Sequence, residues 1–433
     1  MITPRSAAFL GAALALVSVT ACAQTPGEAR ESQSADAGDA AAIQECVPVE
    51  SRSPNADRQQ PAFEGQTRAC SVTAGVEFEL TVIATGLEHP WAVEPLPDGD
   101  FLVTERPGRM RIVSSGGRLS PPIAGIPGVY ARSQGGLLDV ALSPEFAADR
   151  TIFWSYAELR DGGNATSVAR GVLSEDGSRV DDVRVILRSG PPASSGIHFG
   201  SRLAFGPDGM LYVTLGERGS GRPQAQEMDS HLGKILRIAP DGSVPADNPF
   251  VGQNGTRPEI WTRGHRNVQA STFDPDGRLW TIEHGPRGGD ELNLIEPGVN
   301  YGWPIQSYGE EYSGRGIRGS RTQRTGIRQP VYYWDPVIAP SGAQWYSGDA
   351  FPGWRGSLFV GALKEERLVR LELAPDTASG PASAGGWRVT GEEHLLVDRG
   401  QRVRDVRQGP DGALYVVTDE DRGELWRLGP PTP

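Results

Sequence analysis

Short runs in which apolar residues alternate with polar ones begin near Phe78 and recur to the end of the chain. Each run follows a turn rich in Pro, Asp or Gly, and the pairing of such a turn with alternating flanks predicts a β-hairpin. The clear copies are PDGDFLVTE from Pro97, PDGMLYVTLGE from Pro207, PDGRLWTIEHG from Pro275 and PDGALYVVTDE from Pro410; the weaker ones are PEFAADRTIFWSY from Pro144 and PGWRGSLFVGALK from Pro352.

Six hairpin units in series predict an all-β fold over residues 72–433: a six-bladed β-propeller whose blades each hold four antiparallel strands around a channel. The uneven spacing of the units indicates blades with insertions. A pair of stacked β-sandwiches is the alternative arrangement of the same strands. With 56 Gly and 35 Pro in 433 residues, the composition also favours many short strands over helices.

The formal net charge of −12 argues against a nucleic-acid surface and favours a solvated acidic exterior. A cluster of Arg and Lys inside such a chain therefore needs a physical reason.

The N-terminal residues 1–22 read as an export signal. Arg5 precedes an apolar run from Ala7 to Val19 that is too short to span a bilayer. The sequence Val19-Thr20-Ala21-Cys22 resembles a bacterial lipobox, in which Cys22 carries the lipid. We expect an exported lipoprotein on the periplasmic side of the outer membrane, or a soluble periplasmic protein if the signal is simply cleaved.

Residues 23–71 are polar and lack apolar periodicity, which predicts a flexible tether that ends in a stapled segment. If Cys22 carries lipid, Cys46 and Cys70 remain as a disulfide pair in an oxidising compartment. Two free thiols are the alternative.

The segment before each turn is expected to be the innermost strand of its blade, so the residues that begin these segments should meet at the channel. A histidine, two amides and several cations occupy these positions or the adjacent strand end. They are Gln134, His198, Arg266, Asn267, Lys364, Arg402 and Arg404. So many positive charges around one axis imply an anionic ligand, because they would otherwise repel one another. The alternative is that each cation pairs with a carboxylate at the mouth, such as Glu105, Glu217 or Asp419.

The loop after the fourth turn reads EHGPRGGDE from Glu283 and is followed by NYGWP from Asn300. It offers carboxylates and backbone carbonyls but no soft ligands, which is the donor set that calcium accepts.

These motifs, taken in order, resemble the PQQ-dependent glucose/sorbosone dehydrogenase family and its aldose sugar dehydrogenase branch (PQQ is pyrroloquinoline quinone). The similarity covers Phe78 to Leu428. It rests on the ordered motifs GLEHPWA, QGGLLDVALSP, HFGSRLAFGPDG, HLGKILRI with DGSVPADNPF, GHRN, EHGPRGGDELN with NYGWP, GALK and RVRDV.

The resemblance implies oxidation of aldoses at C1 to the lactone, with PQQ and calcium as cofactors. His198 matches the base that takes the proton from the anomeric hydroxyl while hydride passes to the quinone, and Arg266 matches the residue that stabilises the growing negative charge. The remaining matches are contacts to the cofactor, namely Gln134, Asn267, Lys364, Arg402 and Arg404. PQQ is a tricarboxylate, which accounts for the cations.

The family also implies that carbonyls at Gly285 and Pro286 hold the calcium on the quinone, and that Glu291 and Tyr301 hold a second, structural calcium. One position departs from the glucose-specific branch: Ile197 stands where an aspartate precedes the catalytic histidine. The sequence therefore indicates aldoses in general, with an unidentified electron acceptor.

Two other functions fit a six-bladed propeller. A calcium-dependent lactonase would need Asn, Asp and Glu ligands around the axis, where this chain has mainly Arg, Gln and His. A non-catalytic exported binding propeller is the other. No P-loop, dinucleotide fingerprint or HExxH motif occurs, and the six histidines show no zinc spacing.

Overall fold

The computed structural model describes residues 46–376 and 385–431, which belong to one compact unit, Cys46–Pro433. The predicted signal peptide, the lipobox with Cys22, and the tether from residue 23 to residue 45 lie outside the described residues. Within the described ranges no helix is both long and apolar enough to cross a membrane.

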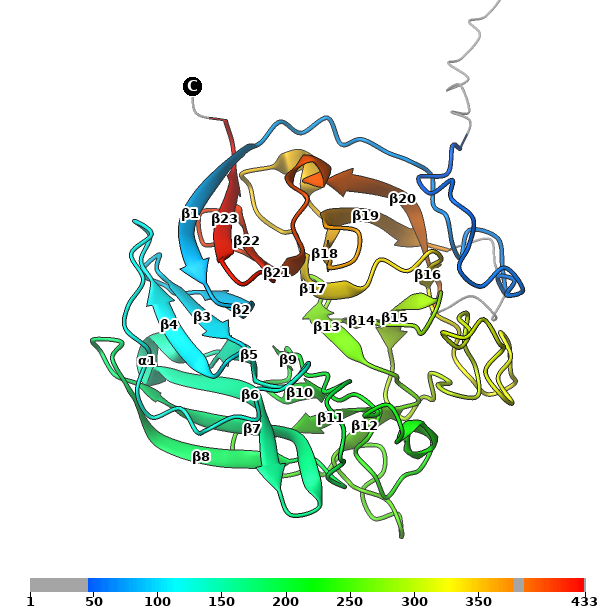
Figure 1. Ribbon diagram of the computed structural model, residues 1–433, viewed down its shortest axis with the longest axis horizontal. Helices are drawn as coiled ribbons and strands as arrows, with labels where there is room; N and C mark the ends of the chain where they lie inside the picture. Colours follow the sequence, from blue (N-terminus) through cyan, green and yellow to red (C-terminus); the bar gives the residue numbers. More distant parts are fainter. Residues whose placement is uncertain (1–45, 377–384, 432–433) are drawn as a thin grey trace, which may run out of the picture. The chain divides into compact units, whose positions relative to one another are not determined.

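Six antiparallel sheets stand around a central axis (Figure 1). In chain order the first three blades are β2 (Pro90–Pro95), β3 (Phe101–Glu105) and β4 (Arg109–Val113); β5 (Leu137–Leu142), β6 (Thr151–Arg160), β7 (Gly163–Leu173) and β8 (Val180–Arg188); and β9 (Leu203–Phe205), β10 (Leu211–Thr214), β11 (Lys234–Ile238) and β12 (Ile260–Arg263).

The other three blades are β13 (Val268–Phe273), β14 (Leu279–Glu283), β15 (Asp290–Ile295) and β16 (Tyr332–Trp334); β17 (Pro340–Trp345), β18 (Leu358–Ala362), β19 (Arg367–Pro375) and β20 (Trp387–Leu395); and β21 (Val403–Gln408), β22 (Leu414–Thr418), β23 (Gly423–Gly429) and β1 (Glu79–Leu87). The helices in the described ranges are short: α1 (Phe146–Asp149), η1 (Arg222–Ala225), η2 (Pro352–Trp354) and η3 (Val397–Arg399).

The prediction of a six-bladed propeller is confirmed. Five blades have four strands, and in the first blade the fourth strand is reduced to a bridge between Val113 and Leu119. The N-terminal strand β1 pairs with the C-terminal strand β23, so one blade is built from both ends of the folded unit and closes the ring.

The predicted turns lie where expected, between the innermost strand of a blade and the next strand. In the third blade Asp208 Oδ1 accepts a hydrogen bond from the backbone N–H of Met210 at 3.0 Å, and Gly209 has φ of +73°. An Asp that bonds the backbone two residues on, followed by a residue with positive φ, explains why Asp and Gly mark these turns.

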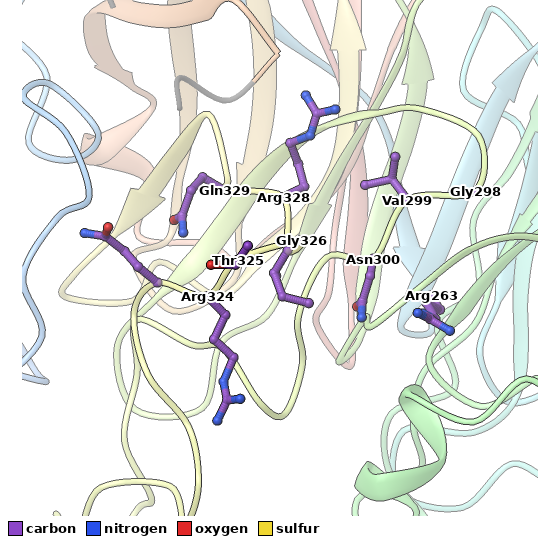
Figure 2. Close-up of a pocket in the computed structure, with 11 residues that line it drawn as sticks. Arg263, Gly298, Val299, Asn300, Arg324, Thr325, Gly326, Arg328 and Gln329 are labelled. Atoms are coloured by element: carbon purple, nitrogen blue, oxygen red, sulfur yellow. The ribbon is translucent and has the colours of Figure 1, made fainter. Parts of the chain in front are cut away.

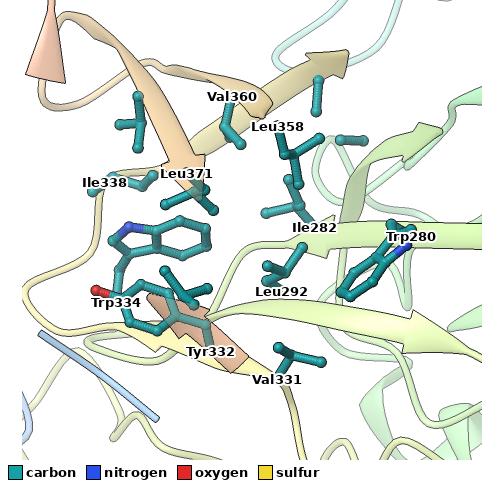
Figure 3. Close-up of a cluster of buried hydrophobic side chains, with 14 of the residues drawn as sticks. Trp280, Ile282, Leu292, Val331, Tyr332, Trp334, Ile338, Leu358, Val360 and Leu371 are labelled. Carbon is teal, nitrogen blue, oxygen red and sulfur yellow. The ribbon is translucent and has the colours of Figure 1, made fainter. Parts of the chain in front are cut away.

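The hydrophobic core lies between adjacent blades. Figure 3 shows the cluster between the fourth and fifth blades, where Trp280, Ile282 and Leu292 face Leu358 and Val360. Such packing orients each inner strand relative to its neighbours, and this orientation brings the starts of the six inner strands together around the channel.

Residues 46–72 form a segment closed by a disulfide between Cys46 and Cys70 and packed on the outer side of the fourth and fifth blades. We call this segment the strap. It precedes β1 and pairs with β20 through a bridge between Ser71 and Glu392.

Candidate active site

A cavity of about 290 Å³ opens at the axis, on the side where the inner strands start. Its walls come from all six blades, as the repeat pattern predicts. The lining residues are His89, Trp91, Arg106, Gln134, Phe199, Gly200, Asn267, Gln269, His284, Ala339, Leu363, Arg402, Arg404 and Asp419.

His198 precedes β9 and sits beside this cavity, 8% exposed. Its backbone N–H donates to Oε1 of Gln134 at 2.7 Å, so the predicted amide positions the predicted base. The ring Nδ1 lies 3.1 Å from Oε1 of Glu217, although the two are not aligned as a hydrogen bond here. Catalytic hydrogen bonds often align only when substrate is bound, so this distance is compatible with an acid–base pair.

Burial lowers the pKa of His198 below its ordinary value of 6.5, and the positive charge of Arg266 lowers it further, while Glu217 opposes both. The imidazole is therefore neutral at pH 7. A carboxylate beside Nδ1 favours the tautomer with the proton on that nitrogen, which leaves Nε2 free to accept a proton.

Arg402 and Arg404 come from the start of β21 and share one carboxylate. Asp419 Oδ2 accepts from Arg404 Nη2 and, at 3.3 Å, from Arg402 Nη2, while Oδ1 lies 3.1 Å from Nδ1 of His89. Burial alone would raise the pKa of Asp419, but the two guanidinium groups hold it well below its usual value. Arg106, also on the wall, donates to the carbonyl of Ser133 and has no carboxylate partner among the described residues. The wall therefore keeps an excess of positive charge.

Arg266 lies next to the cavity, in the wall between it and the loop from His284 to Gly289. Its Nη1 donates to the carbonyls of His284 and Gly285, at 3.1 and 2.8 Å, and its guanidinium stands 5.3 Å from the ring centre of Trp303. Its Nε is buried and has no hydrogen-bond partner in the described part of the chain. The Arg266 side chain is thus held by neutral groups and forms no ion pair with a carboxylate among the described residues.

The two remaining predicted cofactor contacts, Asn267 and Lys364, differ from each other in where they lie. Asn267 lines the cavity, and its Oδ1 accepts from the N–H of Gly200 at 3.2 Å. Lys364 follows β18 with an exposed side chain and is not among the lining residues, whereas its neighbour Leu363 is. Four of the seven predicted cofactor residues therefore line the cavity, namely Gln134, Asn267, Arg402 and Arg404; His198 and Arg266 lie beside it, and the Lys364 side chain is exposed.

The predicted calcium loop is tightly folded. A Cβ on Gly285 would stand 2.3 Å from the carbonyl oxygens of both Gly288 and Gly289, so only glycine fits there. The carbonyl of Gly285 accepts a hydrogen bond from Arg266. Gly285 and Pro286 both line a second, smaller cavity next to the axial one.

Glu291 lines that smaller cavity as well. Burial, followed by the nearby Glu283 carboxylate, raises the pKa of Glu291 well above its usual value, so the site favours a proton or a cation there. The Tyr301 side chain does not join it, because its hydroxyl donates to the carbonyl of Leu294 and its ring stacks on His265. No group of three or more His, Cys, Asp or Glu side chains arranged to hold a metal is found in the described part of the chain.

Two residues that the sequence analysis weighed only as charge partners belong to the site: Glu217 beside His198, and Asp419 between the arginines. Both follow the second strand of their blades, and Glu105 and Glu283 are the last residues of the second strand in theirs, so a carboxylate recurs at or just beyond this strand end in four blades. That repeated position was a usable signal. The wall residues Trp91, Arg106, Gln269 and His284 were not identified as ligand contacts.

A larger cavity of about 800 Å³ lies elsewhere, between the end of β12 and residues 323–329 (Figure 2). Its arginines do not converge: Arg328 pairs with Glu296, and Arg324 donates to the carbonyls of Ile305 and Gly319. The charged side chains of this cavity therefore do not surround one common point, as those of the axial cavity do.

The fold and the site together define a class: a six-bladed propeller with an axial, cation-rich cavity and a buried neutral histidine beside it. Residues 87–427 match the family model described as glucose/sorbosone dehydrogenase. The chain belongs to this family.

Curated and solved relatives agree with this assignment. The chain is 45% identical, over 84% of its length and 94% of the relative's, to the aldose sugar dehydrogenase YliI of Escherichia coli K12. A crystal structure of the soluble E. coli aldose sugar dehydrogenase in the apo form matches with a TM-score of 0.76 and 44% identity, over 82% of this chain and all of the other. The PQQ-bound aldose sugar dehydrogenase of Streptomyces coelicolor matches with a TM-score of 0.63 and 32% identity, over 81% and 98%.

Proposed function

We propose that this chain is a PQQ-dependent aldose sugar dehydrogenase that oxidises the sugar at C1 to the lactone. The observation that carries the proposal is the pairing of a neutral, buried His198 with a cavity whose cations exceed its carboxylates. Family membership and the PQQ-bound relative supply the reaction class.

The cavity residues fit PQQ. Arg106, Arg402 and Arg404 face the cavity with Asp419 as their acidic neighbour, so carboxylates of the cofactor would complete the charge balance. Nε of Arg404 is buried and has no hydrogen-bond partner within residues 46–376 and 385–431, as expected of a donor whose acceptor belongs to a bound ligand. Bound PQQ would supply a quinone that accepts a hydride.

His198 acts as the general base on the anomeric hydroxyl of the sugar. Because its imidazole is neutral, Nε2 can take the hydroxyl proton as the hydride leaves C1, and Glu217 stabilises the resulting imidazolium. Arg266 would stabilise negative charge on a bound quinone. Arg218, packed over the ring of Phe199, donates to the carbonyls of Ser195 and Ile197 and so holds the segment that leads to His198.

Calcium fits the loop beneath the cavity through its oxygen donors. The carbonyls of Gly285 and Pro286 would hold the ion that acts as a Lewis acid toward the quinone. Glu291, which otherwise needs a proton, is a suitable ligand for a structural ion, whereas the Tyr301 hydroxyl already donates to the carbonyl of Leu294.

The same proposal includes export and partners. The N-terminal residues direct the chain to the periplasmic side, with Cys22 as the lipid attachment point, and a separate electron acceptor reoxidises the cofactor. The mass of the mature N-terminus tests the anchor: a chain that begins at any residue other than Cys22 would contradict it.

Reconstitution tests the function. Apo protein mixed with PQQ and calcium should reduce a dye when supplied with aldoses, and inactivity across a broad aldose panel would refute the proposal. The panel should include lactones assayed for hydrolysis, because lactone hydrolysis without dye reduction would favour the lactonase alternative. Cavity walls of Arg, Gln and His, with Asp419 already shared by two arginines, disfavour that alternative.

The variants His198→Ala and Arg404→Ala separate catalysis from cofactor binding. We expect His198→Ala to abolish turnover while PQQ still binds. Arg404→Ala should raise the PQQ concentration for half activity by about 30-fold, since it removes one partner of a buried charge pair. Arg427→Ala, whose guanidinium pairs with Asp411 away from the cavity, is the matched control and should leave that concentration unchanged. A near-normal kcat for His198→Ala would show that another group is the base.

A further inference from the structure

The strap, residues 46–72, precedes the span that matches the family model. Its two ends are joined by the Cys46–Cys70 disulfide and by two backbone hydrogen bonds, from Val49 to Ala69 and from Ser71 to Val47. The strap is therefore a closed loop with a defined shape, and the residues at its tip are held in fixed positions.

Several contacts attach the strap to the fourth and fifth blades. The N–H of Ala69 donates to the hydroxyl of Tyr332 at 3.0 Å, and the N–H of Tyr333 donates to the carbonyl of Gln66 at 2.9 Å. Backbone bonds also link Cys70 and Val72 to Glu392 of β20. In Figure 1 the strap is the blue segment beside β16 and β20.

The tip of the strap, Asn55 and Ala56, is hydrogen-bonded to the turn that follows β16. The N–H groups of Asn55 and Ala56 donate to the two carboxylate oxygens of Asp335, at 2.5 and 3.1 Å. In return, Oδ1 of Asn55 accepts from the N–H of Val337 at 3.0 Å. Ala56 is 1% exposed, and its Cβ lies 3.0 Å from where a Cβ on Gly288 would stand, so the strap also touches the predicted calcium loop.

The same turn is bonded to the cavity wall. The N–H groups of Ile338 and Ala339 donate to Oδ2 of Asp290, at 2.9 and 2.8 Å, and Oδ1 of Asp290 accepts from the N–H of Gly285 at 2.8 Å. Ala339 lines the cavity, and the carbonyl of Gly285 holds Arg266. Hydrogen bonds, together with the backbone from Val337 to Ala339, thus connect Asn55 to Arg266.

We propose that the strap is part of the cofactor site and that Asn55 is a positioning residue, which holds the 335–339 turn and thereby the Gly285–Pro286 loop and Arg266 in place. The disulfide keeps Asn55 at the turn, so reduction of Cys46–Cys70 weakens the hold. The identity of the cofactor rests on the proposed function, whereas the coupling of strap to loop does not.

The first test is amide hydrogen exchange on the full chain without cofactor. Asn55→Ala removes the acceptor for Val337 and should speed exchange at Val337, Ile338, Ala339 and Gly285 by about five-fold, the effect of one lost hydrogen bond. Arg52→Ala is the matched control on the same strap, because among the described residues its exposed side chain pairs with Glu50 and Glu365 alone. Unchanged exchange in Asn55→Ala, or equal acceleration in Arg52→Ala, would overturn the proposal.

The second test is PQQ binding in the presence of calcium. Asn55→Ala should raise the PQQ concentration for half-saturation by about five-fold and Arg52→Ala by less than about two-fold. Wild-type protein treated with a phosphine reductant should follow Asn55→Ala in both tests, which covers the case in which the variant does not fold. If wild-type protein binds no PQQ, the proposed function fails and hydrogen exchange still decides the role of the strap.

Discussion

The positions of His198 and Glu217 depend on contacts with residues that lie far away in the sequence and that no motif near His198 indicates. His198 lies before β9 with φ of +56°, a conformation that only surrounding contacts maintain. Gln134 holds its N–H, and Arg218 holds the carbonyl of the preceding Ile197. Burial lowers the pKa of Arg218 to about 10, yet it stays charged at neutral pH beside Glu217. The base is thus held from both sides of its backbone.

Glu217→Gln tests the pairing with His198. Burial and Arg266 lower the pKa of His198 and the Glu217 charge raises it, so the variant should have a still lower pKa. In the wild type we expect kcat/KM to hold as the pH falls to 6.5 and to decline only below it. In the variant this acidic limb should shift to lower pH, while kcat falls about 10²-fold because the ring loses its orienting partner.

A complete pH–rate profile with saturating PQQ measures both effects. A merely structural role for Glu217 would lower kcat without shifting the acidic limb. An acidic limb that moves to higher pH would contradict the assignment.

At the scale of elements, the loop from β14 to β15 is held in shape by Asp290, the first residue of β15. Asp290 accepts the N–H groups of Gly285, Ile338 and Ala339, and so joins the loop to the segment that leads into β17. Burial raises the pKa of Asp290 to about 7, while these three donors oppose the rise. The motif EHGPRGGDE predicted oxygen ligands for a metal, but it did not show that the Asp290 carboxylate accepts hydrogen bonds from backbone N–H groups instead.

Asp290→Asn should loosen this loop. An amide offers one accepting oxygen where the carboxylate offers two, so at least one N–H loses its partner. We expect the PQQ concentration for half activity to rise about ten-fold. Asp276→Asn, an exposed position in the β13–β14 turn of the same blade, should change it by less than about two-fold. Titration of activity against PQQ measures the difference, and equal effects in both variants would argue against the anchoring role.

The hairpins themselves were predictable from the sequence. A Pro-Asp-Gly turn and the alternation beside it act within about ten residues, where local geometry dominates. The first blade, with three strands and a single bridge, shows the limit, because nothing near Leu119 announces a reduced fourth strand.

At the scale of the whole molecule, buried charges join the inner strands below the cavity. Arg202, 1% exposed, lies 2.7 Å from Asp139 of β5 and 3.2 Å from Asp405 of β21, and its guanidinium stands 4.3 Å from the ring centre of Trp91. It also donates to the carbonyl of Gln269 in β13. One side chain thus links inner strands of four different blades and the loop before β9.

Arg202→Met should destabilise the fold by about 3–5 kcal/mol, because it leaves Asp139 and Asp405 buried with one fewer cation. Arg179→Met, which breaks an exposed pair with Asp181, should change the free energy of unfolding by less than about 1 kcal/mol. Urea unfolding monitored by tryptophan fluorescence distinguishes the two variants. Equal stability of Arg202→Met and the wild type would show that the network is not needed to hold the ring.

The amino-acid sequence by itself determined the six hairpins, the inner strands and the cationic axial positions, because these depend on turns and alternation close along the chain. Only the tertiary structure decided which charges pair. Asp419 pairs with Arg402, Arg404 and His89, and the Lys364 side chain lies outside the cavity wall. Asn55 is hydrogen-bonded to Asp335, which follows it by 280 positions in the sequence. Such contacts depend on the closure of the ring, where β1 meets β23, and closure places residues together that no local pattern relates.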